Sequence, residues 1–181
     1  MFLLSLLGLG FSFTSCDDDD PIIPVEQELI TTLTYTLSPM AGGADVILRF
    51  VDLDGDGGMD PTVTNAALAA NQTYTGSIEL LNEAADPTED ITEEIQELDQ
   101  EHQFFFSSTI SDLAVSYNDE DADGNPLGLS TTVTTGSSAS GAMTVILRHE
   151  PNKSASGVSN GDITNAGGES DIEVTFQIDV Q

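Results

Sequence analysis

The sequence predicts an all-β fold, an antiparallel β-sandwich of about eight or nine strands that carries one short amphipathic helix. Two observations lead to this expectation. Apolar and polar residues alternate over many short segments, as they do on strands with one buried face. Clusters of Gly, Asn, Asp and Pro, which are typical of turns, separate these segments. With 181 residues, the chain is long enough for one domain with a hydrophobic core.

The strands are expected to begin after a linker and to fill a single domain over residues 29–181. Alternation over 29–37 predicts the first strand, and residues 46–51 form the second. Further strands are expected at 72–81, 103–109, 113–118, 128–135, 142–149 and 171–180. In one of them, Phe104 and Phe106 should point to one face and Phe105 to the other. Short strands at such spacing are typical of an Ig-like sandwich.

One segment, residues 86–99, has the periodicity of a helix. Asp86 is expected to cap it, Pro87 to occupy its first turn and Glu89 to complete a capping box. Its apolar face would consist of Ile91, Ile95 and Leu98. The sequence therefore predicts a short amphipathic helix that lies on the sandwich or closes one end of it.

Two parts of the chain resemble each other. Residues 31–50 match residues 131–149, and the tripeptide TNA at 64–66 recurs at 164–166. The match predicts two related β-units, with Arg49 and Arg148 in equivalent positions where each neutralises nearby carboxylates. The alternative is a chance match, because strands rich in Thr and Val are alike in composition.

The charge balance is strongly acidic: 32 acidic residues face three basic ones, and the formal net charge is −29. Such a charge repels phosphate backbones, so we expect no nucleic-acid partner. It favours cations as ligands, and bound cations would reduce the self-repulsion of the folded chain.

The N-terminal residues have the pattern of an export signal. Residues 2–13 are uncharged and mostly apolar, but too short to span a bilayer, and Thr14, Ser15 and Cys16 follow. This arrangement resembles a lipobox, which implies that residues 1–15 are a signal peptide and that Cys16 is lipidated. The alternative is an ordinary secretory signal. No Lys or Arg precedes the apolar run, which suggests that the true start lies upstream of Met1.

An acidic linker is expected at residues 16–28. Four consecutive aspartates, 17–20, repel one another and stay solvated. The run resembles the surface-export signal of Bacteroidota lipoproteins, which implies an outer-membrane protein that faces the cell surface. The alternative is a spacer in a lipoprotein of the periplasmic face.

Two aspartate-rich segments are candidates for Ca²⁺ sites. Residues 52–60 alternate carboxylates around glycines in the manner of calcium loops, and Val63 stands where an EF-hand has its bidentate Glu. The first set of candidate ligands is Asp52, Asp54, Asp56 and Asp60. The second is Asp119, Asp121 and Asp123. Tight hairpin turns favour the same residue types, and for the second segment this alternative is the better one.

The two histidines of the chain, His102 and His149, are the candidate ligands of a transition metal. If the two related β-units pack together, the histidines can approach each other, and Glu101 or Glu150 can complete the site. The alternative is that each histidine lies at a strand end and is exposed or hydrogen-bonded.

Sequence motifs of enzymes are scarce. The chain contains no G-x-S-x-G, H-E-x-x-H, P-loop or dinucleotide-binding pattern. We therefore do not expect an enzyme, and a hydrolase is only the third hypothesis.

Three segments carry a family resemblance: EHQFFF at 101–106, LRHEPNKSASGVSNGDITNAGG at 147–168 and DLDGDGG at 52–58. They resemble a family of small Bacteroidota outer-membrane lipoproteins whose genes often lie near TonB-dependent receptors. Some members carry the label of the type 1 periplasmic-binding fold, which needs two α/β lobes that this strand-rich chain does not supply.

The resemblance implies a lipid-anchored accessory that binds a ligand or partner beside such a receptor. The alternative is a structural or adhesive surface protein that Ca²⁺ stabilises.

Overall fold

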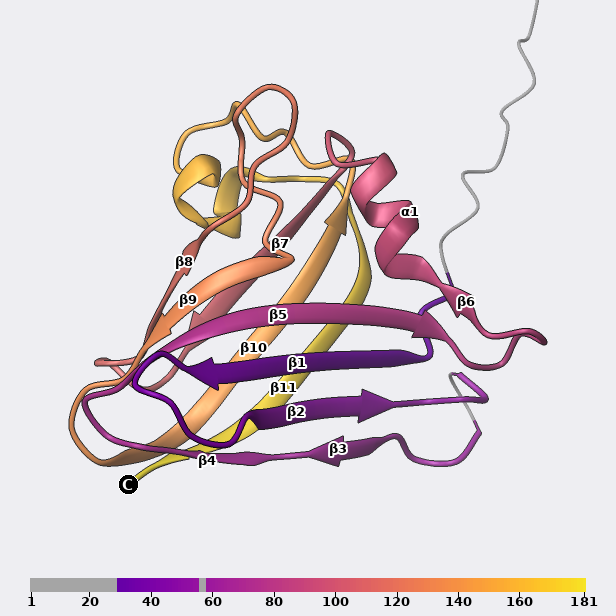
Figure 1. Ribbon diagram of the computed structural model, residues 1–181. Helices are drawn as coiled ribbons and strands as arrows, with labels where there is room; N and C mark the ends of the chain where they lie inside the picture. Colours follow the sequence, from indigo (N-terminus) through magenta and orange to yellow (C-terminus); the bar gives the residue numbers. More distant parts are fainter. Residues whose placement is uncertain (1–28, 56–57) are drawn as a thin grey trace, which may run out of the picture.

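Two sheets face each other as a sandwich, which confirms the expected all-β fold (Figure 1). The computed structural model describes residues 29–55 and 58–181. The predicted signal peptide, the linker with Cys16, and the candidate ligand Asp56 lie outside the described residues. Within the described part, no helix is long and apolar enough to cross a bilayer.

The first sheet has the strand order β3-β2-β1-β5-β9-β8, and β6 pairs with β5 beside this path. Its pairs are all antiparallel. The strands are β1 (Thr32–Pro39), β2 (Val46–Val51), β3 (Thr62–Thr64), β5 (Thr73–Asn82), β6 (Glu89–Asp90), β8 (Ala114–Tyr117) and β9 (Ser130–Thr134).

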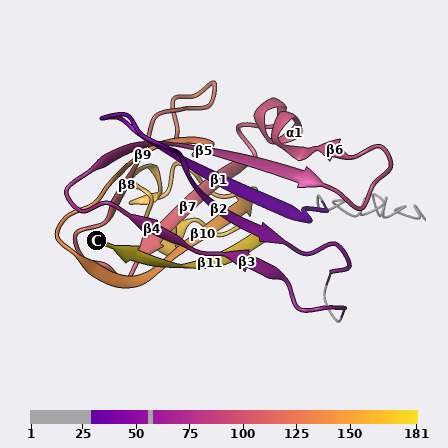
Figure 2. The same ribbon diagram turned by 60° about the horizontal axis from the view of Figure 1, so that its bottom comes forward.

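The second sheet has the order β4-β11-β10-β7, and its strands run obliquely to β1 and β5 (Figures 1 and 2). Its strands are β4 (Ala66–Leu68), β7 (His102–Ser108), β10 (Ala139–His149) and β11 (Glu169–Val180). The pair β4–β11 is parallel, which corrects the expectation of a purely antiparallel sandwich.

The core lies between the sheets and is built by the predicted alternation. Along β10 and β11, every second side chain from Met143 to Leu147 and from Ile172 to Val180 is buried. Phe104 belongs to this core, whereas Phe105 points to the opposite face and packs against Val158 and Ala166. The expectation for the three phenylalanines is therefore confirmed.

The outer face of the second sheet is partly covered by a loop between β10 and β11. This loop contains two single-turn 3₁₀ segments, η1 (Val158–Asn160) and η2 (Ile163–Asn165). Gln103, whose side chain also points to the outer face, is fully buried and donates its amide N–H to the Val158 carbonyl at 3.0 Å. The loop thus fixes the end of the sheet at which β7 begins.

The helix α1 (Ile91–Glu97) is shorter than expected and begins later. The predicted capping box of Asp86 and Glu89 is wrong, because Glu89 already belongs to β6 and pairs with Asn82 of β5. The cap is Asp90, whose carboxylate accepts the Thr92 N–H at 2.9 Å.

The apolar face of α1 packs against the end of the sandwich, as expected. Ile91 and Ile95 are buried in the main core. Leu98 is instead the C-cap residue and remains 37% exposed. The helix thus covers one end of the gap between the sheets.

Three short strands, β3, β4 and β6, were not expected from the sequence. They have three, three and two residues, too few to show an alternation. With them the described residues form eleven strands rather than eight or nine.

The two segments that resemble each other do not fold alike. β1 and β2 pair as a hairpin within the first sheet, whereas residues 131–149 give β9 to the first sheet and β10 to the second. The prediction of two related β-units is therefore wrong for the described residues. Arg49 forms an ion pair with Glu83 at 3.1 Å, while Arg148 donates to the Gly168 carbonyl.

Candidate metal centre

The two histidines lie side by side at one end of the second sheet. His102 begins β7, His149 ends β10, and the register pairs them directly. Their rings stack with centroids 4.7 Å apart and planes 16° from parallel. Both side chains lie on the inner face of the sheet, in line with Phe104 and Leu147, so they are buried. The histidines thus approach each other because they lie on neighbouring strands of one sheet, and not because two related β-units pack together.

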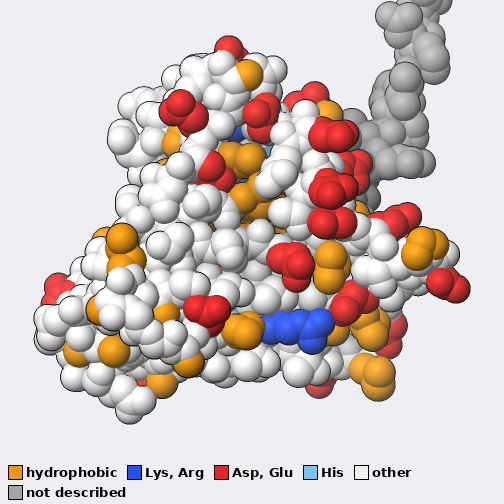
Figure 3. Space-filling view, in the orientation of Figure 1, with side chains coloured by type: hydrophobic (Ala, Val, Ile, Leu, Met, Phe, Trp, Pro, Cys, Tyr) orange, Lys and Arg blue, Asp and Glu red, His pale blue; other side chains and the backbone are white. Residues whose placement is uncertain are grey.

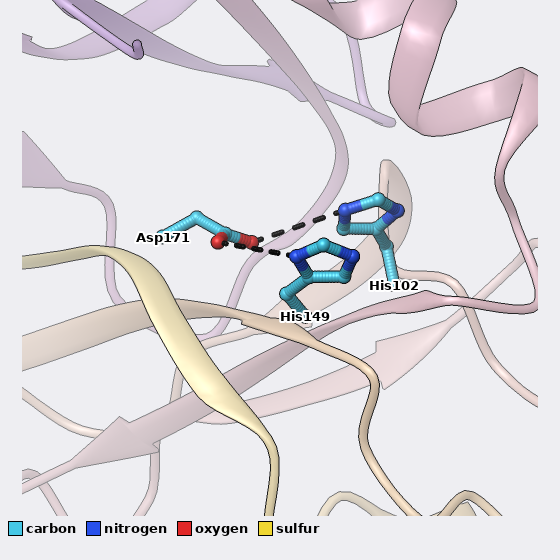
Figure 4. A group of neighbouring side chains, drawn as sticks. All are labelled: His102, His149 and Asp171. Carbon is cyan, nitrogen blue, oxygen red and sulfur yellow. Dashed lines mark ion pairs between the residues drawn. The ribbon is translucent and has the colours of Figure 1, made fainter. Parts of the chain in front are cut away.

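A carboxylate from β11, the strand next to β10, faces both rings. Asp171 of β11 places Oδ2 3.9 Å from His102 Nε2 and Oδ1 3.9 Å from His149 Nδ1 (Figure 4). Its side chain is fully buried. Three adjacent strands therefore each contribute one titratable side chain to the same point.

A β-bulge explains why Asp171 points inward. Leu147 pairs with Ile172, but the next residue, Arg148, pairs with Ser170, so Asp171 is the extra residue of β11. Strict alternation would turn Asp171 to the opposite face from Ile172. The bulge interrupts this alternation and redirects the side chain, as bulges do near functional sites.

His102 is held in one orientation by the end of α1. Its Nδ1 lies 3.0 Å from the carbonyl oxygen of Leu98. A carbonyl only accepts, so Nδ1 carries the proton, and in the neutral ring Nε2 offers a lone pair toward Asp171. A histidine that donates one N–H to a carbonyl and offers the other nitrogen is the usual geometry of a metal ligand.

The separations suit a transition metal after a small closure. One donor atom from each of His102, His149 and Asp171 lies within 4.8 Å of the others. Ligands with bonds of about 2.0–2.2 Å on a tetrahedral ion are about 3.4 Å apart. The two separations of 3.9 Å end on different oxygens of Asp171, and one donor atom from each residue lies within 4.8 Å of the others, so the three donors would have to close by about 0.5 to 1.4 Å.

Glu101 and Glu150 form an outer part of the same cluster. Glu101 Oε2 lies 3.8 Å from His149 Nε2, and donor atoms of Glu101, His149 and Glu150 are within 4.8 Å of one another. Both glutamates are exposed. Glu150 has a φ of 50°, which is rare for a residue with a side chain. Gly168 packs so tightly on the His149 carbonyl oxygen and the Glu150 backbone that a Cβ there would clash.

Two carboxylates of the first aspartate-rich segment accept backbone N–H groups. Asp52 accepts the Gly55 N–H at 2.9 Å, and Asp54 accepts the Met59 N–H at 3.0 Å. A cavity of about 130 Å³ lies among the residues Val51, Asp52, Leu53, Asp54, Met59, Asp60 and Thr62. Asp52 and Asp54 thus have backbone partners, and the calcium site predicted at residues 52–60 stays a prediction.

The carboxylates of the second aspartate-rich segment have separate partners. Asp119 accepts the N–H groups of Gly128 and Ser130, both at 2.8 Å. The carboxylate of Asp123 accepts from the Gln100 side chain at 3.0 Å. These contacts fit the turn that was the alternative to a calcium site.

Asp121 pairs with Lys153 at 2.9 Å, and both side chains are buried. The Lys153 ammonium also donates to the Asp99 and Pro126 carbonyls. Burial by itself raises the pKa of Asp121, but the hydrogen bonds from Lys153 and the Asn125 backbone outweigh it, so this pKa lies below its ordinary value.

Sequence reasoning missed Asp171 and Lys153. Asp171 was assigned only to a strand, because no sequence pattern marks a bulge. Lys153 lies in a loop, but it is the single lysine of a very acidic chain, and that scarcity was a usable signal of a buried ion pair.

Comparison with known proteins adds little. The chain matches no family model and no curated protein. Among solved structures, it is similar to domains 4 and 5 of the S-layer protein SbsC, with 11% identity and a TM-score of 0.31. The match covers 81% of this chain and 75% of that one, and it assigns neither a ligand nor a location to the present protein.

Proposed function

We propose that this protein is a metal-binding lipoprotein whose β-sandwich holds one divalent transition-metal ion, with zinc as the best-suited example. His102 Nε2, His149 Nδ1 and an Asp171 oxygen would be its ligands. The observation that carries the proposal is their convergence from three neighbouring strands onto one buried point. Imidazole and carboxylate ligands together favour zinc and its neighbours over calcium or magnesium.

The site would leave one coordination position open. Structural zinc sites are closed by four protein ligands, whereas a set of three, as in catalytic sites, leaves one position for water or a further ligand. Asp171 compensates part of the charge of the ion, and the Leu98 carbonyl fixes the tautomer of His102. Because the sequence carries none of the common enzyme motifs, we propose a binding module rather than an enzyme.

We also propose that Cys16 anchors the protein in the outer membrane, with the domain at the cell surface as an accessory to a TonB-dependent receptor. The lipobox-like residues, the acidic run and the family resemblance support this part. Two or three acyl chains give a stable anchor, whereas one gives marginal binding.

The anchor is tested by fractionation. Cys16→Ser should release the chain from membranes, whereas Ser15→Ala, which keeps a small residue before the cysteine, should leave it attached. Mass spectrometry of the N-terminal peptide of the wild type should find acyl chains on Cys16. A Cys16→Ser chain that stays in the membrane fraction contradicts the anchor.

Metal binding is tested by calorimetric titration of the Cys16→Ser chain with Zn²⁺. Asp171→Asn preserves volume but removes a charged ligand. Mutation of residues that only hydrogen-bond to metal ligands lowers metal affinity by up to about 100-fold, so we expect a loss of about this size for a ligand itself. Glu173→Gln, an equal change of charge at an exposed position of the same strand, is the control. Equal affinities of wild type and Asp171→Asn would contradict the proposal.

The same titration with Ca²⁺ addresses the second candidate, a surface protein that calcium stabilises. The observation in its favour is the cavity bordered by Asp52, Asp54 and Asp60. If that candidate holds, Ca²⁺ raises the melting temperature, and Asp60→Asn removes the rise. If zinc alone binds, the histidine cluster is the functional site.

A further inference from the structure

His149 belongs to two groups of potential ligands at once. Its Nδ1 faces Asp171 at 3.9 Å, and its Nε2 faces Glu101 at 3.8 Å. A neutral imidazole has one lone pair, on either Nδ1 or Nε2. It can therefore coordinate a metal on one side only while it donates an N–H on the other.

The two groups differ in their access to solvent. His102 and the Asp171 side chain are fully buried. On the other side of the His149 ring, the Glu101 side chain is 52% exposed, and Glu150 is exposed. A cavity of about 350 Å³ is bordered by His149, Glu150, Gly168 and Glu169. His149 thus lies between solvent and the buried group.

We propose that His149 Nε2, Glu101 and Glu150 form an outer loading position, through which the metal ion enters and leaves the inner site of His102, His149 Nδ1 and Asp171. This inference rests on the proposed function. The two positions exclude each other because they share one imidazole, so each chain holds one ion.

The transfer of the ion is coupled to the tautomer of His149. With the ion inside, Nδ1 coordinates it, and Nε2–H donates to Glu101. With the ion outside, Nε2 coordinates it, and Nδ1–H donates to Asp171. In each state a carboxylate accepts the proton of the ring nitrogen that does not bind metal, an arrangement that fixes the tautomer of the ring. Only the proton on the ring changes sides, so the total charge of the site stays constant.

The glutamates at the cavity also attract cations. Glu150 and Glu169 line it, and Glu101 lies beside His149. Against these three carboxylates stands the Arg148 guanidinium, which donates to the carbonyl of the lining residue Gly168 at 3.3 Å, so the negative charge prevails. A cleft in which one charge sign prevails raises the local concentration of the opposite ion and its association rate, by about 10- to 1,000-fold where the lining carries that sign alone. The outer position should therefore govern rates more than equilibrium affinity.

The experiment compares exchange rates with affinity. Zinc uptake by the Cys16→Ser chain, and zinc release to a chromogenic chelator, are followed by stopped-flow absorbance. In the double variant Glu101→Gln/Glu150→Gln, we expect uptake to slow by about tenfold, because the cavity attracts the cation less strongly. Release should slow by a similar factor, because the ion can no longer pass through the outer position. The dissociation constant should change by less than about threefold, since the amide introduced at position 101 retains an oxygen that accepts the Nε2–H and the inner ligands are intact. Glu79→Gln, at an exposed position of β5, is the control.

The outcomes separate this inference from the proposed function. Slower exchange with nearly unchanged affinity and one zinc per chain supports the loading position. Unchanged rates in the double variant, or two zinc ions per wild-type chain, overturn it while metal binding stands. A wild-type chain that binds no zinc overturns both.

Discussion

The Lys153 side chain joins three loops: its own loop between β10 and β11, the loop between α1 and β7, and the loop between β8 and β9. It donates to the Asp99 carbonyl behind α1, to the Asp121 carboxylate and to the Pro126 carbonyl, and it is almost fully buried. Through Asp99 it holds the turn that leads into Glu101 and His102. The buried Lys153 ammonium, with its three acceptors, therefore helps to position His102 of the metal centre.

Removing this ammonium should destabilise the fold strongly. Lys153→Met keeps much of the apolar stem but leaves the buried Asp121 charge without its cation, so we expect a loss of about 3–5 kcal/mol in the free energy of unfolding. Urea denaturation measures it. Adding Asp121→Asn should recover part of the loss, because an uncharged amide is cheaper to bury. A single variant that loses less than about 1 kcal/mol would contradict this role.

The same pair predicts a dependence of stability on pH. The pKa of Asp121 is lower in the folded protein than in the unfolded chain, so folding favours the ionised form. Its contribution is complete above the ordinary aspartate pKa of about 3.9 and is lost as the pH falls through the lower folded-state value. The stability gap between wild type and Asp121→Asn should therefore narrow below about pH 4. Urea midpoints measured over this range check it, and a constant gap would contradict it.

The start of α1 shows that a sequence pattern alone does not determine where a helix begins. The pattern of an aspartate followed three residues later by a glutamate occurs at Asp86–Glu89 and again at Asp90–Glu93. The sequence favours the first because Pro87 follows it. The structure uses the second, because residues 89–90 pair with β5 and Ile91 and Ile95 then reach the core. Because β6 pairs with β5, the helix is capped by Asp90, four residues after the cap that the sequence favours.

The helix start can be tested with two matched substitutions. Asp90→Ala removes the carboxylate that accepts the Thr92 N–H and should cost about 1 kcal/mol of stability. Asp86→Ala removes the aspartate that the sequence favoured and should cost less than half of that. Thermal or urea denaturation of both variants distinguishes the two starts. A larger loss for Asp86→Ala would contradict the observed cap.

The candidate site was predictable only in part. His102 and His149 could be singled out because they are the histidines of the chain, and the strands that carry them alternate clearly. Asp171 could not, because the bulge that turns it inward depends on the pairing of β11 with β10. In the same way, long strands such as β5 and β10 follow from alternation, whereas β3, β4 and β6 exist only through their partners.

At the scale of the whole molecule, folding brings many negative charges close together, since the formal net charge is −29. Acidic side chains gather on the face around α1 in Figure 3. Against the 32 acidic residues stand Arg49, Arg148 and Lys153, which the fold already engages in local contacts. The remaining carboxylates repel one another across the surface, which opposes the compact state.

Salt should therefore stabilise this protein. Raising the NaCl concentration from about 0.01 M to about 0.15 M shortens the screening length from about 30 Å to about 8 Å. We expect the melting temperature, measured with a chelator present, to rise by about 3 °C or more, which corresponds to about 1 kcal/mol for a chain of this size. Choline chloride should give the same rise if screening is the cause. A melting temperature that stays constant or falls would contradict the account.

The most direct test of the metal centre is an anomalous difference map from a zinc-loaded crystal, measured at the zinc absorption edge. The account predicts one strong peak within bonding distance of His102 Nε2, His149 Nδ1 and a carboxylate oxygen of Asp171, with the three side chains drawn together. A map with no peak there, or with its peak at the aspartates of residues 52–60 instead, would contradict it.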